Sequence, residues 1–189
     1  MNKLIIWLAY NLKIDLLLKK ISKNIKQANA KRLALKYNTP ISFVEQGDGS
    51  LHIESLNVST SEFKIDSTSH LKSNTFIECS GGVIIGRYFH TGKSLTIYSV
   101  KHNYENATKI PYDEKFIFEK VIIEDFVWCG SNVTILSGVK IGEGAIIASN
   151  SIVTKNIPPF AIAGGNPAKI IKYRDQEEFL QLKDNNHFY

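Results

Sequence analysis

The sequence has little sulfur, and this shortage excludes several classes of protein. Only two cysteines and one methionine occur among the 189 residues. We expect Cys79 and Cys129 to be buried thiols rather than a disulfide or a metal pair, which is consistent with a reducing compartment. The five histidines show no close pairing with one another or with cysteine, so no zinc motif and no metal site is predicted.

Acidic residues are nearly absent from the first 38 residues. This segment holds nine lysines and arginines against a single acid, Asp15, whereas the rest of the chain has 14 basic and 17 acidic residues. The net charge of +5 is therefore a local feature of the N-terminal segment. We expect no nucleic-acid surface on the domain, because its basic charge is not spread over it.

The same segment also lacks glycine and proline, and it is rich in Leu, Ile, Lys and Ala, so residues 1–38 are predicted to be helical. Asn11, Lys13 and Asp15 interrupt the apolar run well before the roughly 18 residues of a membrane span. No small-residue cleavage site follows residues 4–10, which argues against a signal peptide. Two interpretations remain: the helix caps the open end of the domain, or it lies on an anionic membrane surface.

Small apolar side chains return at every sixth residue in the second half of the chain. The repeated positions are Cys129, Ile135, Ile141, Ile147 and Val153, and further buried-type residues stand four places after each. A period of six fits neither a helix nor a continuous strand. It predicts an all-β solenoid of triangular coils, each built from three hexapeptides, with the small apolar residues stacked inside.

A second block with the same period runs from Ile65 to Ile97, and the two blocks are out of phase. Residues 101–116 are predicted to be an excursion loop that accounts for the slip. The repeat region is predicted to occupy residues 39–160 and to stop at Pro158–Pro159. Residues 161–189 form a C-terminal extension, with a short final helix at 175–183 whose first turn is acidic.

Residues 127–172 resemble, without a gap, the hexapeptide-repeat acyltransferases, in particular the galactoside, maltose and capsule or O-antigen O-acetyltransferases. The resemblance resumes at residues 84–102. It implies a left-handed parallel β-helix that assembles as a homotrimer with active sites between subunits. It also implies acetyl-CoA as co-substrate and a sugar hydroxyl of a surface polysaccharide or its precursor as acceptor. The cysteine usage and the basic N-terminal helix suggest a cytoplasmic location, peripheral to the inner face of the membrane.

The resemblance gives His102, at the start of the excursion, the role of general base. A hydroxyl is a poor nucleophile near neutral pH, and imidazole is the side chain best matched to remove its proton. The backbone N–H of Ser131 would donate to the oxyanion of the tetrahedral intermediate. His90 is interpreted as structural or acceptor-facing. Ser80 aligns with an acid that holds the base in some relatives, so the orienting partner of His102 stays open among Glu78, Asn74 and Glu105.

The remaining predicted site residues contact the two substrates. Those implied for coenzyme A are Trp128, Ser131, Ser149, Thr154, Lys155, Lys169 and Lys172. Relatives often have arginine at the last two positions, so contact with adenine is less well specified here. Those implied for the acceptor are Tyr104, Tyr112 and Asn74.

Three alternatives to an O-acetyltransferase remain open from the sequence. The first is an N-acetyltransferase of a nucleotide-linked amino sugar, since an amine needs a base less urgently. The second is a metal hydratase of the carbonic anhydrase type, which requires three converging histidines. The third is a scaffold or membrane-recruited partner without catalytic activity.

Overall fold

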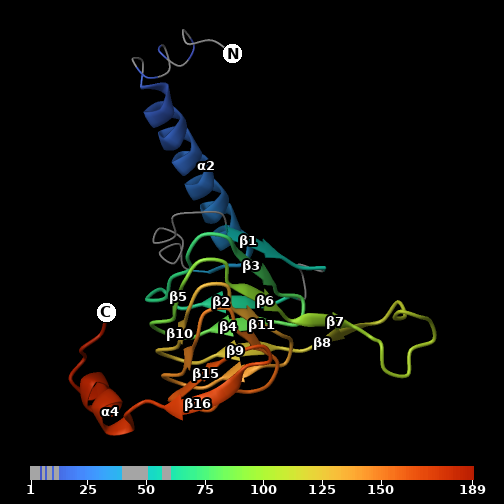
Figure 1. Cartoon of the computed structure of the whole chain (residues 1–189). Helices are drawn as coiled ribbons and strands as arrows, with labels where there is room; N and C mark the ends of the chain where they lie inside the picture. Colours follow the sequence, from blue (N-terminus) through green and yellow to red (C-terminus); the bar gives the residue numbers. More distant parts are fainter. Residues whose placement is uncertain (1–4, 6, 8–9, 11–12, 40–50, 57–60) are drawn as a thin grey trace.

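The computed structural model describes residues 5, 7, 10, 13–39, 51–56 and 61–189. The chain forms a parallel β-solenoid, from one end of which helix α2 (Ile14–Lys36) projects (Figure 1). A hairpin arm leaves the side of the solenoid, and helix α4 (Gln176–Asp184) lies beside its other end. The parallel β-helix predicted from the six-residue repeat is confirmed.

The solenoid has three faces, and its strands pair in parallel from coil to coil. Face A consists of β1 (Leu51–Glu54), β3 (Thr75–Glu78), β6 (Thr96–Tyr98), β11 (Thr134–Ile135) and β14 (Ile152–Val153). Face B consists of β2 (Phe63–Ile65), β4 (Val83–Ile85), β9 (Val121–Ile123) and β12 (Lys140–Ile141). Face C consists of β5 (His90–Thr91), β10 (Trp128–Cys129), β13 (Ile146–Ile147), β15 (Ala161–Gly164) and β16 (Lys169–Tyr173). The chain passes from C to A to B in each coil.

The repeated side chains fill the interior, as predicted. The five residues from Cys129 to Val153 that recur at six are fully buried, and so are those four places after them, with the last, Ile157, at 5% exposure. Each Val or Ile side chain among them contributes about 1.5–3 kcal/mol of burial energy. Both cysteines are buried and free. Burial raises the pKa of Cys79 to about 11, so this thiol stays protonated at neutral pH.

The three corners of the prism are built from different residues with left-handed backbone angles. Glycine forms the corner between faces A and B, at Gly82 and Gly138. Short polar residues form the C–A corner: Asn74, Ser94, Asn132 and Asn150. The B–C corner instead carries large aromatic residues, Tyr88 (φ 53°), Phe126 (φ 59°) and Phe160 (φ 61°), with Gly144 between them in the stack. This aromatic corner is the unexpected one, because bulky side chains are disfavoured at positive φ.

The coil continues past the boundary predicted at residue 160. Strand β15 pairs in parallel with β13, and Ala161 and Ala163 are fully buried. Pro158 and Pro159 lie in the turn before β15, where no ladder hydrogen bond is needed from their nitrogens, so they do not stop the coil. Strand β16 then turns back antiparallel to β15. The predicted final helix is confirmed, and the Asp175 side chain caps it by accepting from the Glu178 N–H.

Helix α2 does not cap the solenoid along its length. Only its last turn packs there, through the buried residues Leu33 and Ala34 and the following Tyr37, whose ring meets Phe63 edge-on at 5.9 Å. The rest of the helix extends away from the first coil (Figure 1). The capping interpretation is therefore wrong for most of the described helix. No helix in the described part of the chain is long and apolar enough to cross a membrane.

Candidate functional site

The predicted excursion is an arm built on a two-stranded hairpin. Strand β7 (Val100–His102) pairs antiparallel with β8 (Phe116–Phe118), and His102 lies opposite Phe116. The arm leaves after β6 on face A and returns before β9 on face B, so it replaces one A–B corner. Figure 1 shows it extending away from the coils. His102 thus stands on an ordered strand at the base of the arm.

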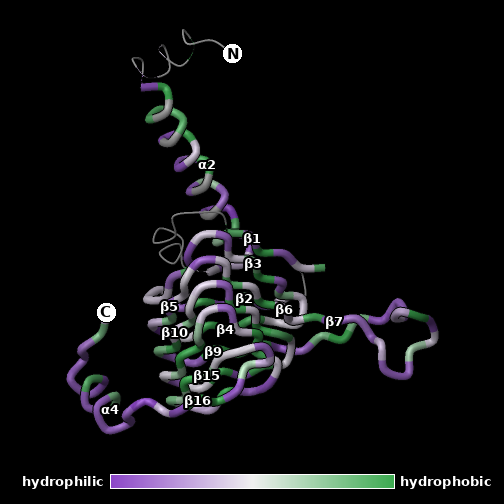
Figure 2. The backbone as a smooth tube through the Cα atoms, in the orientation of Figure 1, coloured by the Kyte–Doolittle hydropathy of each residue, from purple (hydrophilic) through white to green (hydrophobic). Residues whose placement is uncertain are grey.

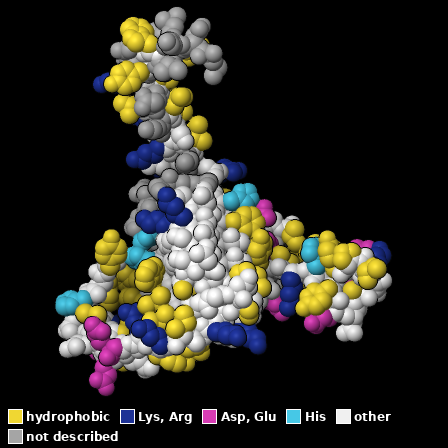
Figure 3. Space-filling view, in the orientation of Figure 1, with side chains coloured by type: hydrophobic (Ala, Val, Ile, Leu, Met, Phe, Trp, Pro, Cys, Tyr) yellow, Lys and Arg dark blue, Asp and Glu magenta, His cyan; other side chains and the backbone are white. Residues whose placement is uncertain are grey.

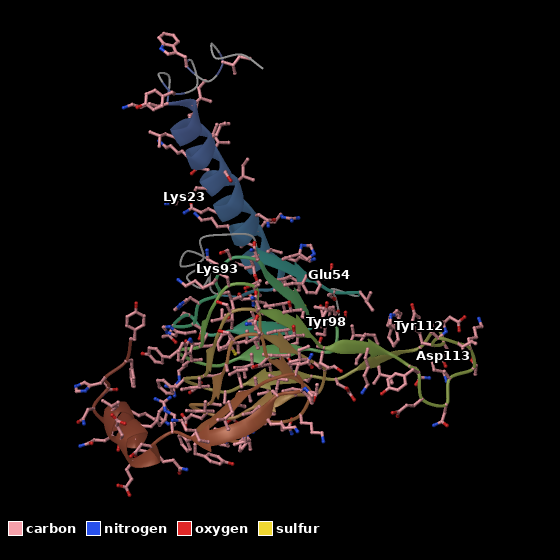
Figure 4. All side chains as sticks on the ribbon, viewed as in Figure 1. Lys23, Glu54, Lys93, Tyr98, Tyr112 and Asp113 are labelled. Atoms are coloured by element: carbon pink, nitrogen blue, oxygen red, sulfur yellow. The ribbon has the colours of Figure 1, made fainter. Side chains whose placement is uncertain are left out.

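Aromatic rings hold the His102 side chain. The imidazole stacks on Tyr112, with ring centroids 3.8 Å apart and planes inclined by 19°, and it contacts Phe116 at 5.0 Å. Tyr112 itself lies on the outer part of the arm (Figure 4). Tyr112 was predicted from the sequence to contact the acceptor, whereas its ring lies against the imidazole of His102. Stacking of this kind restricts the orientation of the imidazole plane.

A buried carboxylate keeps Tyr112 in place. Asp113 is 3% exposed, and it accepts hydrogen bonds from the Asn103 side-chain amide at 2.9 Å and from the backbone N–H groups of Lys115 and Thr108. The Lys115 N–H is the main cause that lowers the pKa of Asp113. Asp113 therefore stays ionised and cross-links the two sides of the arm next to Tyr112.

A cavity of about 470 Å³ lies beside His102 at the base of the arm. Glu54, Glu78 and Tyr98 contribute to its wall; Glu54 and Tyr98 are labelled in Figure 4. Glu78 is committed elsewhere, because its carboxylate accepts from the Ser80 and Ser99 hydroxyls. Ser80 in turn accepts from the Leu56 N–H. The partners that the structure gives to His102 are thus the two rings rather than one of the acids considered from the sequence.

Face C carries a straight row of outward side chains. The strand registers align His70, His90, Trp128, Ile146, Ile162 and Lys172. We refer to this row as the face C ladder. At about 4.8 Å per strand, its five steps span roughly 24 Å. Trp128 is 55% exposed, and Lys172 supplies a cation at the far end.

Ser131 and Ser149 meet where face C turns into face A. The Ser131 N–H donates to the Ser149 hydroxyl at 3.2 Å, which is at the long end for such a bond. A Cβ atom added to Gly130 would lie 2.4 Å from the Ser149 oxygen, so only glycine permits these coils to approach as they do. The Ser131 N–H, which is predicted to donate to an oxyanion, therefore makes a weak hydrogen bond that an oxyanion could replace.

The predicted site residues fall into two groups on one chain. Thr154 and Lys155 follow β14 at the A–B corner, the same corner from which the arm carries His102, Tyr104 and Tyr112. The second group lies on face C or the C–A corner: Trp128, Ser131, Ser149, Lys169, Lys172 and Asn74. The A–B corner lies opposite face C in a three-sided prism. One chain does not bring the two groups together.

The contact between two histidines of the face C ladder was not predicted from the sequence. The His70 and His90 rings meet at 4.1 Å, and burial lowers the pKa of His70 to about 4 and lowers that of His90 as well. Both are therefore neutral near pH 7. Twenty positions separate them, whereas a regular coil brings residues 18 positions apart into contact. The six-residue repeat therefore did not predict that His70 and His90 would meet. Within the described ranges, His, Cys, Asp and Glu form no group of three that could hold a metal ion.

Comparison with known proteins identifies the repeat. Residues 120–155 match the bacterial transferase hexapeptide (six repeats) family. A chloramphenicol acetyltransferase of Klebsiella aerogenes is 36% identical over 116 residues, which cover 53% of this chain and 55% of that protein. This chain therefore spans little more than half the length of that relative.

Two solved structures share the solenoid. A hexapeptide-repeat acetyltransferase of Vibrio cholerae O1 biovar eltor, complexed with acetyl coenzyme A, superposes with a TM-score of 0.58 at 25% identity, covering 80% of this chain and 89% of that one. A galactoside acetyltransferase in complex with coenzyme A gives 0.59 at 21% identity, with 84% and 85% covered. The repeat of this chain is thus that of the bacterial transferase hexapeptide family, and its fold is the β-solenoid of hexapeptide-repeat acetyltransferases.

Proposed function

We propose that this protein is an acetyltransferase that moves the acetyl group of acetyl-CoA to a sugar hydroxyl of a surface polysaccharide or its precursor. The observation that carries the proposal is the arm, which presents His102 stacked on Tyr112 at the A–B corner. The Klebsiella and Vibrio relatives, named as acetyltransferases, support the reaction class. The galactoside enzyme shares only the fold, so the sugar acceptor rests on the residues resembling its family.

The proposed residues can carry out each proton transfer of this reaction. His102 accepts the hydroxyl proton as the acceptor oxygen bonds to the acetyl carbonyl carbon. The Ser131 N–H exchanges its weak bond to Ser149 for the oxyanion that forms. His102 then returns the proton to sulfur as the carbon–sulfur bond breaks, so the products are the acetyl ester and free thiol.

The site forms between two copies of the chain. His102 leaves the prism at the A–B corner, while Trp128 and Ser131 lie on and beside face C. Because that corner is opposite face C, the arm of one chain must reach face C of a neighbour to complete the site. A closed ring in which every arm reaches the next chain gives a homotrimer three equivalent sites.

The face C ladder fits the extended arm of coenzyme A. Apolar side chains at Trp128, Ile146 and Ile162 lie in one row that ends at the cation Lys172. An extended pantetheine chain with a phosphate at its end has the same order, with apolar atoms first and negative charge last. Lys169 on the same strand and Thr154 and Lys155 from the neighbour's A–B corner would complete the phosphate contacts.

Acetyl transfer to matched acceptors tests the proposed function. We expect the protein to acetylate a galactoside hydroxyl in preference to the amine of the corresponding amino sugar, and to show a thermal shift with coenzyme A. Product analysis by mass spectrometry distinguishes ester from amide. Exclusive amide formation would replace this proposal with the N-acetyltransferase, and the absence of both a thermal shift and any product would contradict an acetyltransferase altogether.

We also propose that the N-terminal segment places the enzyme on the inner face of the cytoplasmic membrane. Leu18, Ile21 and Ile25 share one face of α2, and all are exposed, at 59%, 45% and 64%. Lys20 and Lys23 lie on the opposite side. Figure 2 shows the mixture of hydrophobic and hydrophilic residues along the helix, and Figure 3 shows hydrophobic and basic side chains exposed on it. A basic amphipathic helix of this kind suits an anionic lipid surface.

Vesicle binding tests this placement. We expect the protein to bind vesicles of phosphatidylglycerol and phosphatidylcholine but not of phosphatidylcholine alone. The double variant Lys20→Glu/Lys23→Glu should bind roughly tenfold more weakly or worse, since each basic residue contributes about 1 kcal/mol. The variant Lys64→Glu/Lys120→Glu, with the same net charge but changed on face B, should bind as the parent does. Equal binding by both double variants would contradict the proposal.

A further inference from the structure

The segment after β16 runs back along the solenoid rather than away from it. We refer to residues 174–189, which contain α4 and the residues that follow it, as the C-terminal strap. After α4 the strap turns back from the last coil toward the earlier ones (Figure 1). It leaves a cavity of about 460 Å³ between itself and face C. The strap and face C are therefore two walls of one cavity.

The aromatic corner is the surface on which the strap docks. Phe179 of α4 packs edge-on against Phe160 and Phe126, with ring centroids 5.1 and 5.9 Å apart. Phe188 continues the row, at 5.1 Å from Phe126 and 4.7 Å from Tyr88. Every aromatic member of the corner thus contacts a ring of the strap. This contact accounts for bulky residues at positive φ, a conformation that the other two corners give to glycine, asparagine and serine.

The glycine in this corner serves the same contact. A Cβ atom added to Gly144 would lie 3.0 Å from the Phe179 ring, so the ring occupies the space of the missing side chain. Two cations hold the strap further. Lys183 pairs with Glu143 at 2.6 Å, and the Arg174 guanidinium donates to the Gly144 carbonyl at 3.2 Å. The strap is therefore fixed to the prism at successive coils.

The cavity lies over part of the face C ladder. Its floor is formed by His90, Trp128 and Ile146, which are consecutive members of that row, and Phe188 and Tyr189 line it from the strap. A flat face of a solenoid covers only one side of an extended ligand, whereas ligand sites commonly bury about 70–90% of a ligand's surface. The strap supplies the second wall that face C lacks.

The charge of the cavity suits a ligand that carries phosphate. Arg174 and Lys183 line it, and no acidic residue occurs among the described residues that do. The strap also begins two residues after Lys172, the cation at the end of the ladder. An extended apolar chain that ends in phosphate therefore meets no repelling carboxylate along this wall.

We propose that the strap clamps coenzyme A, with Phe188 and Tyr189 closing over the pantetheine arm where it passes Trp128. The inference rests on the proposed function, because it takes the ladder as the cofactor site. It makes Phe188 a cofactor-binding residue and makes the strap a determinant of the rate of cofactor release. The strap approaches from the B–C corner, so the C–A side, where Ser131 lies, stays open to the arm of the neighbouring chain.

The rate of cofactor release tests the clamp. In a Trp7→Phe background Trp128 is the remaining tryptophan, and its fluorescence reports coenzyme A leaving after rapid dilution of the complex. Phe188→Ala should release coenzyme A about fivefold faster or more, because one apolar wall is lost, and should raise the KM for acetyl-CoA but not that for the acceptor. Leu180→Ala, which changes an exposed side chain of the strap outside the cavity, is the matched control and should release at the parental rate.

Hydrogen exchange on the unaltered protein gives an independent measurement. The backbone amides of residues 185–189 should exchange more slowly when coenzyme A is bound, since the bound arm holds the strap closed. Slower exchange and faster release from Phe188→Ala, in a protein that acetylates no acceptor, would contradict the proposed reaction but support the clamp. Acetyl transfer with equal release rates for the parent and Phe188→Ala, or with exchange that coenzyme A does not change, would overturn the clamp and leave the proposed function standing.

Discussion

Replacing His102 with alanine should reduce kcat by roughly 10²–10⁴-fold, the range found when a general base is lost. The acceptor hydroxyl then has no group to take its proton, because the Tyr112 and Phe116 rings that contact His102 cannot replace imidazole as a base. Coenzyme A binding, read as a thermal shift, should stay at the parental level, since the ladder and its lysines are unchanged. Because His102 is exposed on the arm, the substitution leaves the core of the solenoid intact.

The arm offers a matched control for this experiment. Ile110 is 97% exposed at the outer part of the arm, and Ile110→Ala should retain full activity. Full activity of Ile110→Ala would show that a substitution elsewhere in the arm does not stop the reaction. Activity of His102→Ala above a few per cent of the parent would exclude His102 as the base.

Two inactive variants should restore activity when they are mixed in one oligomer. The first is His102→Ala, and the second is Trp128→Ala/Lys172→Glu, which damages the ladder of face C. If each site takes its arm from one chain and its face C from another, random assembly at equal amounts makes about one quarter of the sites intact. If a single chain supplied both parts, no intact site would form.

The recovered activity is measured on protein co-expressed with two different tags and purified through both. Each variant purified alone sets the background and should be nearly inactive. Activity near background in the mixed sample, despite mixed oligomers of normal size, would contradict a site between chains. Because purification through both tags removes the inactive homotrimers, and each mixed trimer holds one intact site of three, recovery close to one third of the parental rate would support an arm that acts on its neighbour.

The fold could be predicted from the sequence because a six-residue period has few structural solutions. Inward-facing residues such as Ile135 and Ile147 recur every six positions, so the repeat can be recognised in the sequence itself. The change of phase before Ile117 indicated the position of the arm. The end of the solenoid was misplaced because prolines 158 and 159 fit a corner as well as they end a strand. Helix α2 was ambiguous, because its composition gives its conformation but not what it contacts.

The site was predicted less completely, since its contacts join residues that no period relates. The Tyr112 ring reaches His102 through a turn that Asp113 fixes, and neither residue carries a local signal for that role. The His70–His90 contact spans a coil of irregular length. The cavity under α4 depends on rings from Tyr88, Phe126 and Phe188, which lie far apart in the sequence and meet only after the coil and the final helix are in place.

The regular spacing of the strands fixes the distances between the side chains of the face C ladder. Each coil adds one rung of about 4.8 Å between Trp128 and Ile162, and the antiparallel strand β16 adds the last rung at Lys172. If coenzyme A binds along the ladder as proposed, the distance from the thioester to the terminal cation is set in steps of one strand, whereas a distance between two loops can vary continuously. A variant that gained or lost one coil of three hexapeptides in this interval would keep its core and its corners. Its ladder would then be one strand spacing too long or too short for the cofactor arm.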